Sequence, residues 1–369
     1  MNIQNDQRIV LSLDAGGTNL VFSAMKAGQM LGEEIILPAK VDSLEAFLEK
    51  LTHGFEQVKQ QAGGADAISF AFPGPADYPN GIIGDLENLP VFRGGIALGP
   101  FLEKKFNIPV FINNDGDLFT LGEALGGLLP MINQELEKAG NPKQYKQLIG
   151  ATFGTGFGGG LVINQQLIIG DNSAGGEINR MGNILYPQFT SEESVSIRGI
   201  KRVYARECNI TIDQCPEPFQ IFKIAKGQEE GHQKAAILSF KELAIVAADA
   251  LANTITMFDA PVVIGGGLSG AHELILPTLV EELNKKFETP SGGQVQRMEV
   301  FAYNWHHTDC KANFLKNSGQ KVLIPGSSEE INYDPIKKIC VGANVLGTGG
   351  AVALGAYAFA ILKLNEIKY

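Results

Sequence analysis

The stretch Ile9–Met25, IVLSLDAGGTNLVFSAM, is the most informative segment of the sequence. It predicts an apolar strand ending at Asp14, a turn, and a second apolar strand. The turn glycines, Gly16 and Gly17, let the backbone approach a phosphate and aim N–H groups at it. Asp14 can hold a hydrated Mg²⁺ that bridges phosphate oxygens. Neutral donors follow at Thr18 and Asn19. Taken alone, the stretch also fits an ordinary Gly-rich hairpin turn.

A second loop of the same build lies roughly one small domain further along the chain. Residues 148–153 predict a strand, and Gly154, Thr155 and Gly156 open a glycine-rich loop after it. Each loop is followed by a predicted hairpin, which turns at 26–29 in the first case and at 164–166 in the second. Two such loops facing each other would clamp a polyphosphate from both sides.

A third glycine cluster follows a predicted buried strand and precedes a predicted helix. It consists of Gly265, Gly266 and Gly267. A triple-glycine turn is weak evidence by itself. After two matching loops, it indicates contact with the base or the ribose of a nucleotide.

Five segments occur in a recognisable order: DAGGT at 14–18, INNDGD at 112–117, FGTGFGGG at 153–160, GGEINR at 175–180 and VVIGGGLS at 262–269. In these segments the chain resembles the ROK family of bacterial glucokinases and related hexose kinases, in the sugar-kinase branch of the actin-like ATPases. The likeness runs from residue 9 to about residue 360. It implies ATP and Mg²⁺ as cofactors and a hexose as the phosphate acceptor.

The length of 369 residues is too great for one hydrophobic core and fits two lobes. The resemblance implies an α/β, two-lobed actin-like (ribonuclease H-like) ATPase fold with a cleft between the lobes. We expect residues 1–115 to form a small lobe and residues 116–349 a large one. A final helix, at about 350–369, should return to the small lobe. An apolar stripe predicts a further helix over 43–61.

Charge and composition exclude several classes of protein. A net charge of −10 argues against nucleic acid as a partner, because binding phosphates needs a basic face. ROK repressors carry a helix-turn-helix segment before the first strand, where this chain has eight residues. No apolar stretch reaches the ~20 residues of a membrane span. The first eight residues are polar, and the spacing of the four cysteines does not suggest disulfide pairs, so we expect a cytoplasmic protein. We expect a homodimer.

The catalytic candidate is Asp115. It follows a predicted strand over 106–112, at the carboxyl end where open α/β sheets bind ligands. A kinase acting on an alcohol needs a carboxylate to accept the hydroxyl proton, and the resemblance places that role on Asp115. We expect Asp117 to cap a helix over 118–129. The alternative is that both aspartates only cap this helix.

The resemblance also implies a set of sugar-binding residues. Glu177 matches a glutamate of the family's ExGH segment, where Arg180 replaces the histidine. Glu193 resembles a later glutamate that reaches the anomeric side of the sugar. Because Glu192 is adjacent, a solvent-exposed carboxylate is the alternative for Glu193. The remaining candidates are Asn114, Gly74 in a PGP turn and Asn88 in an NLP segment.

The usual zinc site of the family is not expected. Its histidine position is Arg180, and an arginine has no acceptor for a metal. The paired CxC run is also missing from the sequence. The segment His306–Cys310 could bind a metal by composition, but a polar surface loop is the favoured interpretation.

These features predict an ATP-dependent hexose kinase with glucose as the expected substrate. A kinase for another hexose or an N-acetylhexosamine is one alternative. A non-catalytic sugar sensor of the same fold is another, although Asp115 and the glycine loops count against it. Residues 294–344 match the family poorly and have no functional interpretation from the sequence.

Overall fold

The computed structural model describes residues 3–15, 19–74, 76–84 and 94–367, and these divide into two compact units. The first unit contains residues 1–127, 160–176 and 346–369, and the second contains 128–159 and 177–345. The division expected from the sequence placed 116–127 and 160–176 in the larger lobe. Residues 116–127 cluster with the first unit because the helix after Asn114 packs along the C-terminal helix, and Gly160 lies against Gly116 and Thr120 of that helix.

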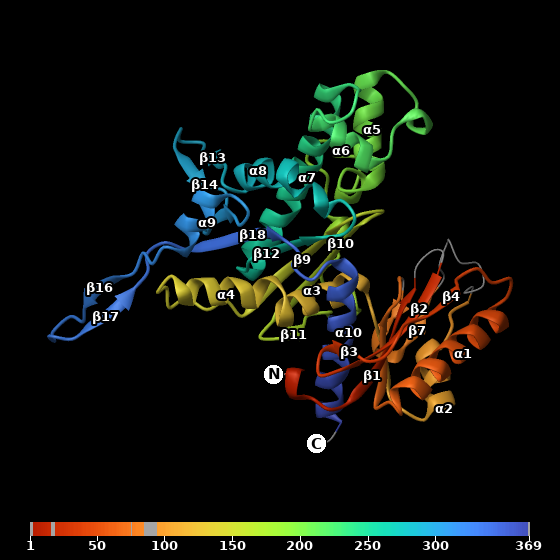
Figure 1. The fold of residues 1–369 in the computed structure, drawn as a ribbon. Helices are drawn as coiled ribbons and strands as arrows, with labels where there is room; N and C mark the ends of the chain where they lie inside the picture. Colours follow the sequence, from red (N-terminus) through yellow and green to blue (C-terminus); the bar gives the residue numbers. More distant parts are fainter. Residues whose placement is uncertain (1–2, 16–18, 75, 85–93, 368–369) are drawn as a thin grey trace. The chain divides into compact units, whose positions relative to one another are not determined.

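The first unit is built on a mixed sheet in which β1 lies between an antiparallel and a parallel neighbour (Figure 1). The order is β3-β2-β1-β5-β8, with β4 also paired to β2. The strands of this sheet are β1 (Ile9–Ala15), β2 (Asn19–Lys26), β3 (Gln29–Met30), β4 (Ile35–Pro38), β5 (Ala67–Ala71) and β8 (Val110–Asn113). The strands β6 (Ala76–Asp77) and β7 (Ile82–Ile83) form a separate two-stranded sheet.

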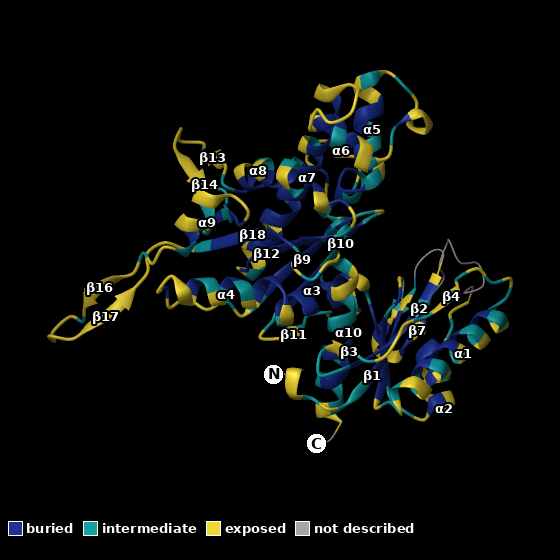
Figure 2. Ribbon diagram, viewed as in Figure 1, coloured by how far each residue is buried: buried dark blue, intermediate teal, exposed yellow. Residues whose placement is uncertain are grey.

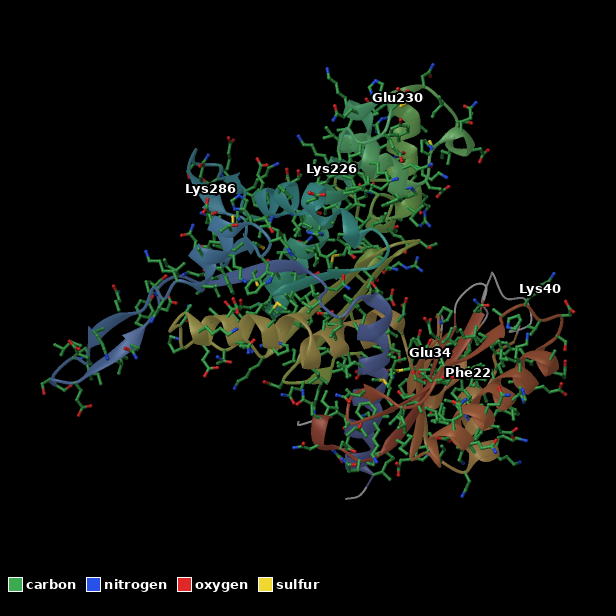
Figure 3. All side chains as sticks on the ribbon, in the orientation of Figure 1. Phe22, Glu34, Lys40, Lys226, Glu230 and Lys286 are labelled. Carbon is green, nitrogen blue, oxygen red and sulfur yellow. The ribbon has the colours of Figure 1, made fainter. Side chains whose placement is uncertain are left out.

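One face of this sheet packs against α1 (Leu44–Ala62), and α2 (Leu98–Phe106) adds to the same core. The predicted helix over 43–61 is confirmed: the Ser43 hydroxyl accepts the Ala46 N–H at 3.1 Å, and Gly63 ends α1 with φ 73°. Phe22, labelled in Figure 3, packs edge-on against Phe55 of α1 with ring centroids 5.0 Å apart. Asn107, with φ 56°, ends α2, so β8 begins at Val110 and not at Phe106 as expected.

The helices α3 (Asp115–Gly126) and α10 (Thr348–Glu366) cross closely within this unit. The predicted helix over 118–129 is wrong at both ends, since Gly127 separates α3 from α4 (Leu128–Lys138). A Cβ on Gly127 would overlap the buried Glu123 carboxylate, which accepts the Leu346 N–H at 2.9 Å. Glycine is therefore required where the two helices separate.

One helix among the described residues, over Thr348–Ile367, is long and apolar enough by length and composition to cross a membrane. The sequence-based expectation that no stretch reaches that length missed it, because its glycines and Tyr357 lie within continuous helix. Tyr357 and its neighbours are fully buried inside the first unit. A core helix of a folded domain passes the same test.

The strand pairs β13-β14 and β16-β17 form two small sheets of the second unit. A larger sheet has the order β11-β10-β9-β12-β18-β15, and its strands β9, β12, β15 and β18 lie in the second unit. Its central strands β9, β12 and β18 are parallel and buried, as expected for strands covered on both faces. The strands are β9 (Gln147–Phe153), β10 (Phe157–Ile163), β11 (Gln166–Leu167), β12 (Val262–Gly265), β13 (Lys286–Glu288), β14 (Gln294–Gln296), β15 (Phe301–Asn304), β16 (Gln320–Leu323), β17 (Glu330–Tyr333) and β18 (Lys338–Ala343).

The helices of the second unit include the long α7, which packs against α5, α6 and α8 (Figure 2). They are α5 (Ile197–Cys208), α6 (Pro218–Ala225), α7 (Gln233–Phe258), α8 (His272–Leu283) and α9 (Thr308–Leu315). α7 begins at Gln233. The buried Ala235 and Ala236 extend its apolar face, and His232 caps it by accepting the Ala235 N–H at 3.1 Å.

Both predicted hairpin turns are confirmed. Ala27 and Gly28 adopt φ of 53° and 72°, and Asn164 and Gln165 adopt 51° and 68°. Positive φ at both central residues is the geometry of a two-residue hairpin loop that follows the strand twist. The returning strand of the first hairpin is split into β3 and β4, and that of the second ends at Leu167.

Candidate active site

A pocket of about 800 Å³ in the first unit brings Asp14 and Asp115 together. The strands β1, β5 and β8 run parallel, so their carboxyl ends share one edge of the sheet. Asp14 lies near the end of β1, and Asp115 is separated from the end of β8 by Asn114 alone. Residues 71–73, after β5, line the same pocket together with Glu34, labelled in Figure 3, and the start of α10.

Asp115 is held by the first turn of α3. The Gly116 N–H donates to the Asn114 side-chain oxygen at 2.8 Å and to the Asp115 carboxylate at 2.9 Å. The Asp115 side chain opens on the pocket, but surrounding atoms crowd its carboxylate and restrict its hydration. This desolvation raises the pKa of Asp115, the two backbone N–H groups of Asp115 and Gly116 oppose it, and the charge of Asp14 raises the pKa further.

The expectation that Asp117 caps α3 is wrong. Asn114 is the N-cap, because its backbone is extended, with φ −70° and ψ 149°, and its side chain accepts from the first turn. Asp117 lies inside that turn and is 6% exposed. Asn114 therefore uses its side-chain oxygen in the cap, accepting the Gly116 N–H.

Several predicted residues of the first unit lie outside the described part of the chain: Gly16, Gly17, Thr18 and Asn88. Asn19 begins β2, where it pairs with Pro38 of β4. Gly74 lies next to the pocket-lining Pro73, and a Cβ there would stand 3.2 Å from the Tyr78 hydroxyl. That hydroxyl donates to the Phe72 carbonyl at 2.9 Å and holds this turn in place.

In the second unit the other two glycine loops lie side by side. A Cβ on Gly154 would stand 3.8 Å from the Gly267 nitrogen, and the Leu268 N–H donates to the Phe153 carbonyl at 2.9 Å. Gly266 has φ +84°, and a Cβ there would overlap the Phe153 backbone. The two loops that follow the carboxyl ends of β9 and β12 therefore contact each other through their backbones.

An aromatic pocket of about 130 Å³ adjoins the third glycine cluster. It is lined by Phe219, Phe222 and Phe240, together with Gly267 and Leu268. Phe222 and Phe240 pack edge to face with centroids 6.3 Å apart, whereas Phe219 is 67% exposed. A flat apolar group could rest here beside the glycine backbone.

The neighbouring glutamates make different contacts. Glu193 pairs with Arg198 at 2.8 Å and lies 3.8 Å from Arg202. Glu192 also pairs with Arg198, at 2.9 Å, and in addition accepts the Phe157 N–H at 3.1 Å. Sequence reasoning named only Glu193 and missed the contact of Glu192 with the loop before β10.

Glu177 and Arg180 bound a short 3₁₀ turn on the second unit, where the Arg180 N–H donates to the Glu177 carbonyl at 3.1 Å. Both residues are exposed. Asn114, Asp115 and Gly74 belong to the first unit and Glu177, Arg180 and Glu193 to the second. Their joint contact with one sugar stays a prediction.

The histidine segment makes structural contacts. His306 accepts the Ala343 N–H through Nε2 at 2.9 Å, and its ring lies 4.6 Å from that of His272. His307 accepts the Cys310 N–H at 3.4 Å and caps α9. Among the described residues no three His, Cys, Asp or Glu side chains gather into a metal site. The absence of zinc remains a prediction.

A model of the ROK family matches residues 10–304. The chain belongs to the ROK family. An N-acetyl-D-glucosamine kinase of Vibrio cholerae serotype O1 is 27% identical over 294 residues, which are 74% of this chain and 88% of that kinase. This finding confirms the resemblance that the five sequence segments carried.

Two crystal structures of ROK-type proteins share the fold. A glucokinase from Parabacteroides distasonis gives a TM-score of 0.89 at 49% identity, covering 98% of this chain and 99% of that one. A ROK family glucokinase from Streptomyces griseus, in complex with glucose and AMPPNP, gives a TM-score of 0.60 at 19% identity, covering 94% and 98%. The predicted α/β, actin-like fold is confirmed.

Proposed function

We propose that this ROK protein is an ATP-dependent hexose kinase that phosphorylates glucose. The observation that carries the proposal is the pair of carboxylates, Asp14 and Asp115, in one pocket at the carboxyl ends of parallel strands. Phosphoryl transfer to an alcohol needs one carboxylate for the proton and one for the metal that accompanies the phosphates.

Asp115 is the proposed general base. The sugar hydroxyl oxygen would attack the terminal phosphorus, its proton would pass to an Asp115 carboxylate oxygen, and ADP would leave. A raised pKa makes the ionised carboxylate a stronger base. The free amide of Asn114 would donate to the same sugar and orient its hydroxyl.

The residues present fit ATP and Mg²⁺. A Cβ at Gly266 would overlap the Phe153 backbone, and glycines at 154, 156 and 267 leave the two adjoining loops without side chains over their backbone, so that a phosphate can approach closely. The aromatic pocket beside Gly267 suits the adenine base. When bound, Mg²⁺ neutralises developing phosphate charge, and Asp14 would hold it through water.

The 49% identity to a glucokinase supports glucose as the substrate. A second candidate is N-acetylglucosamine, because curated relatives at 26–27% identity phosphorylate that sugar by name. Arg180 stands where the family pattern has histidine, so its guanidinium would donate to a sugar hydroxyl or an acetamido oxygen. We also propose a cytoplasmic location, which the free state of the four cysteines, all described, supports.

A sugar panel with ATP and Mg²⁺, read by ADP release, tests the proposal. Glucose should give the highest kcat/KM, and N-acetylglucosamine or mannose should give lower values. Preference for N-acetylglucosamine would establish the second candidate. If the protein binds a sugar but releases no more ADP than the Asp115→Asn variant does, it is a sugar sensor. That outcome would contradict the kinase proposal.

A further inference from the structure

The aromatic pocket beside Gly267 offers a bound group apolar surface and glycine backbone. Three phenylalanines line it, together with a proline, a leucine, an alanine and two glycines. Among these described lining residues, none carries a polar atom in its side chain. A nucleotide base held here would be bound by the faces of its rings and not by hydrogen bonds from side chains.

The polar side chains of α6, which supplies two of the phenylalanines, are engaged elsewhere. The Gln220 side-chain oxygen accepts the Glu217 N–H at 3.2 Å, in the capping box at the start of the helix. Lys223 pairs with Glu229 at 2.9 Å, and its ammonium nitrogen lies 4.7 Å from the centre of the Phe219 ring. Neither Gln220 nor Lys223 lines the pocket.

Polar side chains beyond the other wall of the pocket also have protein partners. The Ser269 hydroxyl donates to the Gly266 carbonyl at 2.7 Å, which ties the glycine loop to itself. Lys226, labelled in Figure 3, follows α6 and pairs with Glu273 of α8 at 2.7 Å. These hydrogen bonds and ion pairs would have to break before the side chains could reach the edge of a base.

Purine bases differ in the hydrogen bonds that their edges offer. Adenine carries an amino donor at position 6, whereas guanine and hypoxanthine, the 6-oxopurines, carry an oxygen acceptor there. A site rejects one of these bases strongly when a buried polar group is left unpaired by it. A backbone donor to N7 cannot distinguish them, because all three bases have this acceptor. An apolar pocket therefore gives little discrimination at position 6.

We propose that this chain uses the triphosphates of 6-oxopurines, GTP and ITP, as phosphoryl donors about as well as ATP. The inference rests on the kinase function proposed above and concerns the same nucleotide site. The sugar oxygen would attack the terminal phosphorus, its proton would pass to Asp115, and the nucleoside diphosphate would leave, whichever of the three bases it carries.

Calorimetry with ADP, IDP and GDP, each with Mg²⁺ and without sugar, tests the recognition of the base. The dissociation constants of IDP and GDP should lie within about tenfold of that of ADP. A preference for ADP over either nucleotide by more than about tenfold would overturn the inference and leave the kinase proposal intact. If none of the three binds, both are wrong.

Turnover tests the same inference in the reaction. With the sugar that gives the most ADP release from ATP, GTP should also release GDP, with a kcat/KM within about tenfold of that for ATP. A larger loss with GTP, while ATP supports turnover, would overturn the inference alone.

A variant of the pocket separates stacking from hydrogen bonding. Phe219→Ser should raise the dissociation constants of ADP, IDP and GDP by a common factor of about fivefold or more, because stacking on an aromatic ring does not depend on which base is bound. Phe219 is 67% exposed, so its removal should leave the fold intact. Met257→Ser, at an 80% exposed position of α7, is the matched control and should change none of the three. An effect of Phe219→Ser on ADP alone, or on no nucleotide, would contradict base recognition by this pocket.

Discussion

The carbonyl oxygen of Ala351 on α10 lies directly against the Cα of Gly122 on α3, so that a Cβ on Gly122 would overlap it. The relation is repeated along the same crossing, where a Cβ on Gly355 would overlap the Leu118 carbonyl. Backbone contact of this kind leaves no flexible side chain that could move aside. The glycines allow α10 to pack closely against the helix that begins at Asp115.

Alanine at Gly122 should therefore destabilise the protein by about 2–3 kcal/mol or more, despite the higher helix propensity of alanine. Denaturant unfolding or the melting temperature checks this. Gly349→Ala is the matched control, because it lies on α10 with no atom within 4 Å of the new Cβ. If Gly122→Ala unfolds at the same denaturant concentration as the wild type, α3 and α10 can separate at little cost in free energy.

The second prediction concerns His306 and acid stability. Crowding by neighbouring atoms, then His272 and Lys311, lowers the pKa of His306 in the folded protein. The unfolded chain takes up this proton at about pH 6.5 and the folded chain only at a lower pH. The contribution of neutral His306 to the free energy of unfolding is thus fully present above about pH 6.5. It is lost as the pH falls toward the lowered pKa of His306 in the folded protein.

In the variant His306→Gln the free energy of unfolding should fall less as the pH is lowered through this range. The glutamine keeps an acceptor for the Ala343 N–H. Urea unfolding between pH 7.5 and 5 measures it. An identical slope in wild type and variant would mean that other groups cause the acid sensitivity. His53→Gln is a suitable control, because it replaces a histidine of the first unit that is remote in sequence from this pair.

Local patterns predicted much of the fold. Residues close together in the sequence were enough to predict three features: the strands beside the glycine loops, the capped helix α1 and both hairpin turns. The start of α3 could not be read the same way, since Asn114 and Asp117 are both good N-caps and only the backbone decides between them. The Glu192–Phe157 contact joins residues 35 apart in sequence, and no spacing rule reveals it.

The third prediction compares two adjacent glycines. Gly266→Ala should destabilise the free protein, because φ +84° costs an alanine about 1–2 kcal/mol and the Cβ overlaps Phe153. Gly267→Ala meets no atom within 4 Å and should leave stability unchanged. If this loop contacts the nucleotide, Gly267→Ala should nonetheless weaken ATP binding in calorimetry. Unchanged ATP affinity in folded Gly267→Ala would remove this loop from the proposed nucleotide site.

The fourth prediction concerns the pKa of Asp115 itself. Because desolvation and then the Asp14 charge raise this pKa, the acid limb of kcat/KM should lie above the ordinary Asp value of about 3.9. In the free protein, Asp14→Asn should lower the pKa of Asp115, since it removes a like charge. Carboxyl-carbon NMR titration of labelled aspartate measures the shift. An upward shift in Asp14→Asn would show that the two carboxylates do not share one electrostatic environment.

The fifth prediction decides the mechanism. Asp115→Asn keeps the shape of the side chain and its acceptor for the Gly116 N–H but cannot take a proton at neutral pH. Loss of a general base typically costs about 10²–10⁴-fold, so kcat should fall by that factor while glucose still binds. Asp171→Asn, an exposed aspartate of the same unit, is the control and should keep full turnover. If kcat persists and KM rises instead, Asp115 positions the sugar, and Glu177 becomes the next candidate for the base. Near-wild-type kcat and KM in Asp115→Asn would place the chemistry elsewhere.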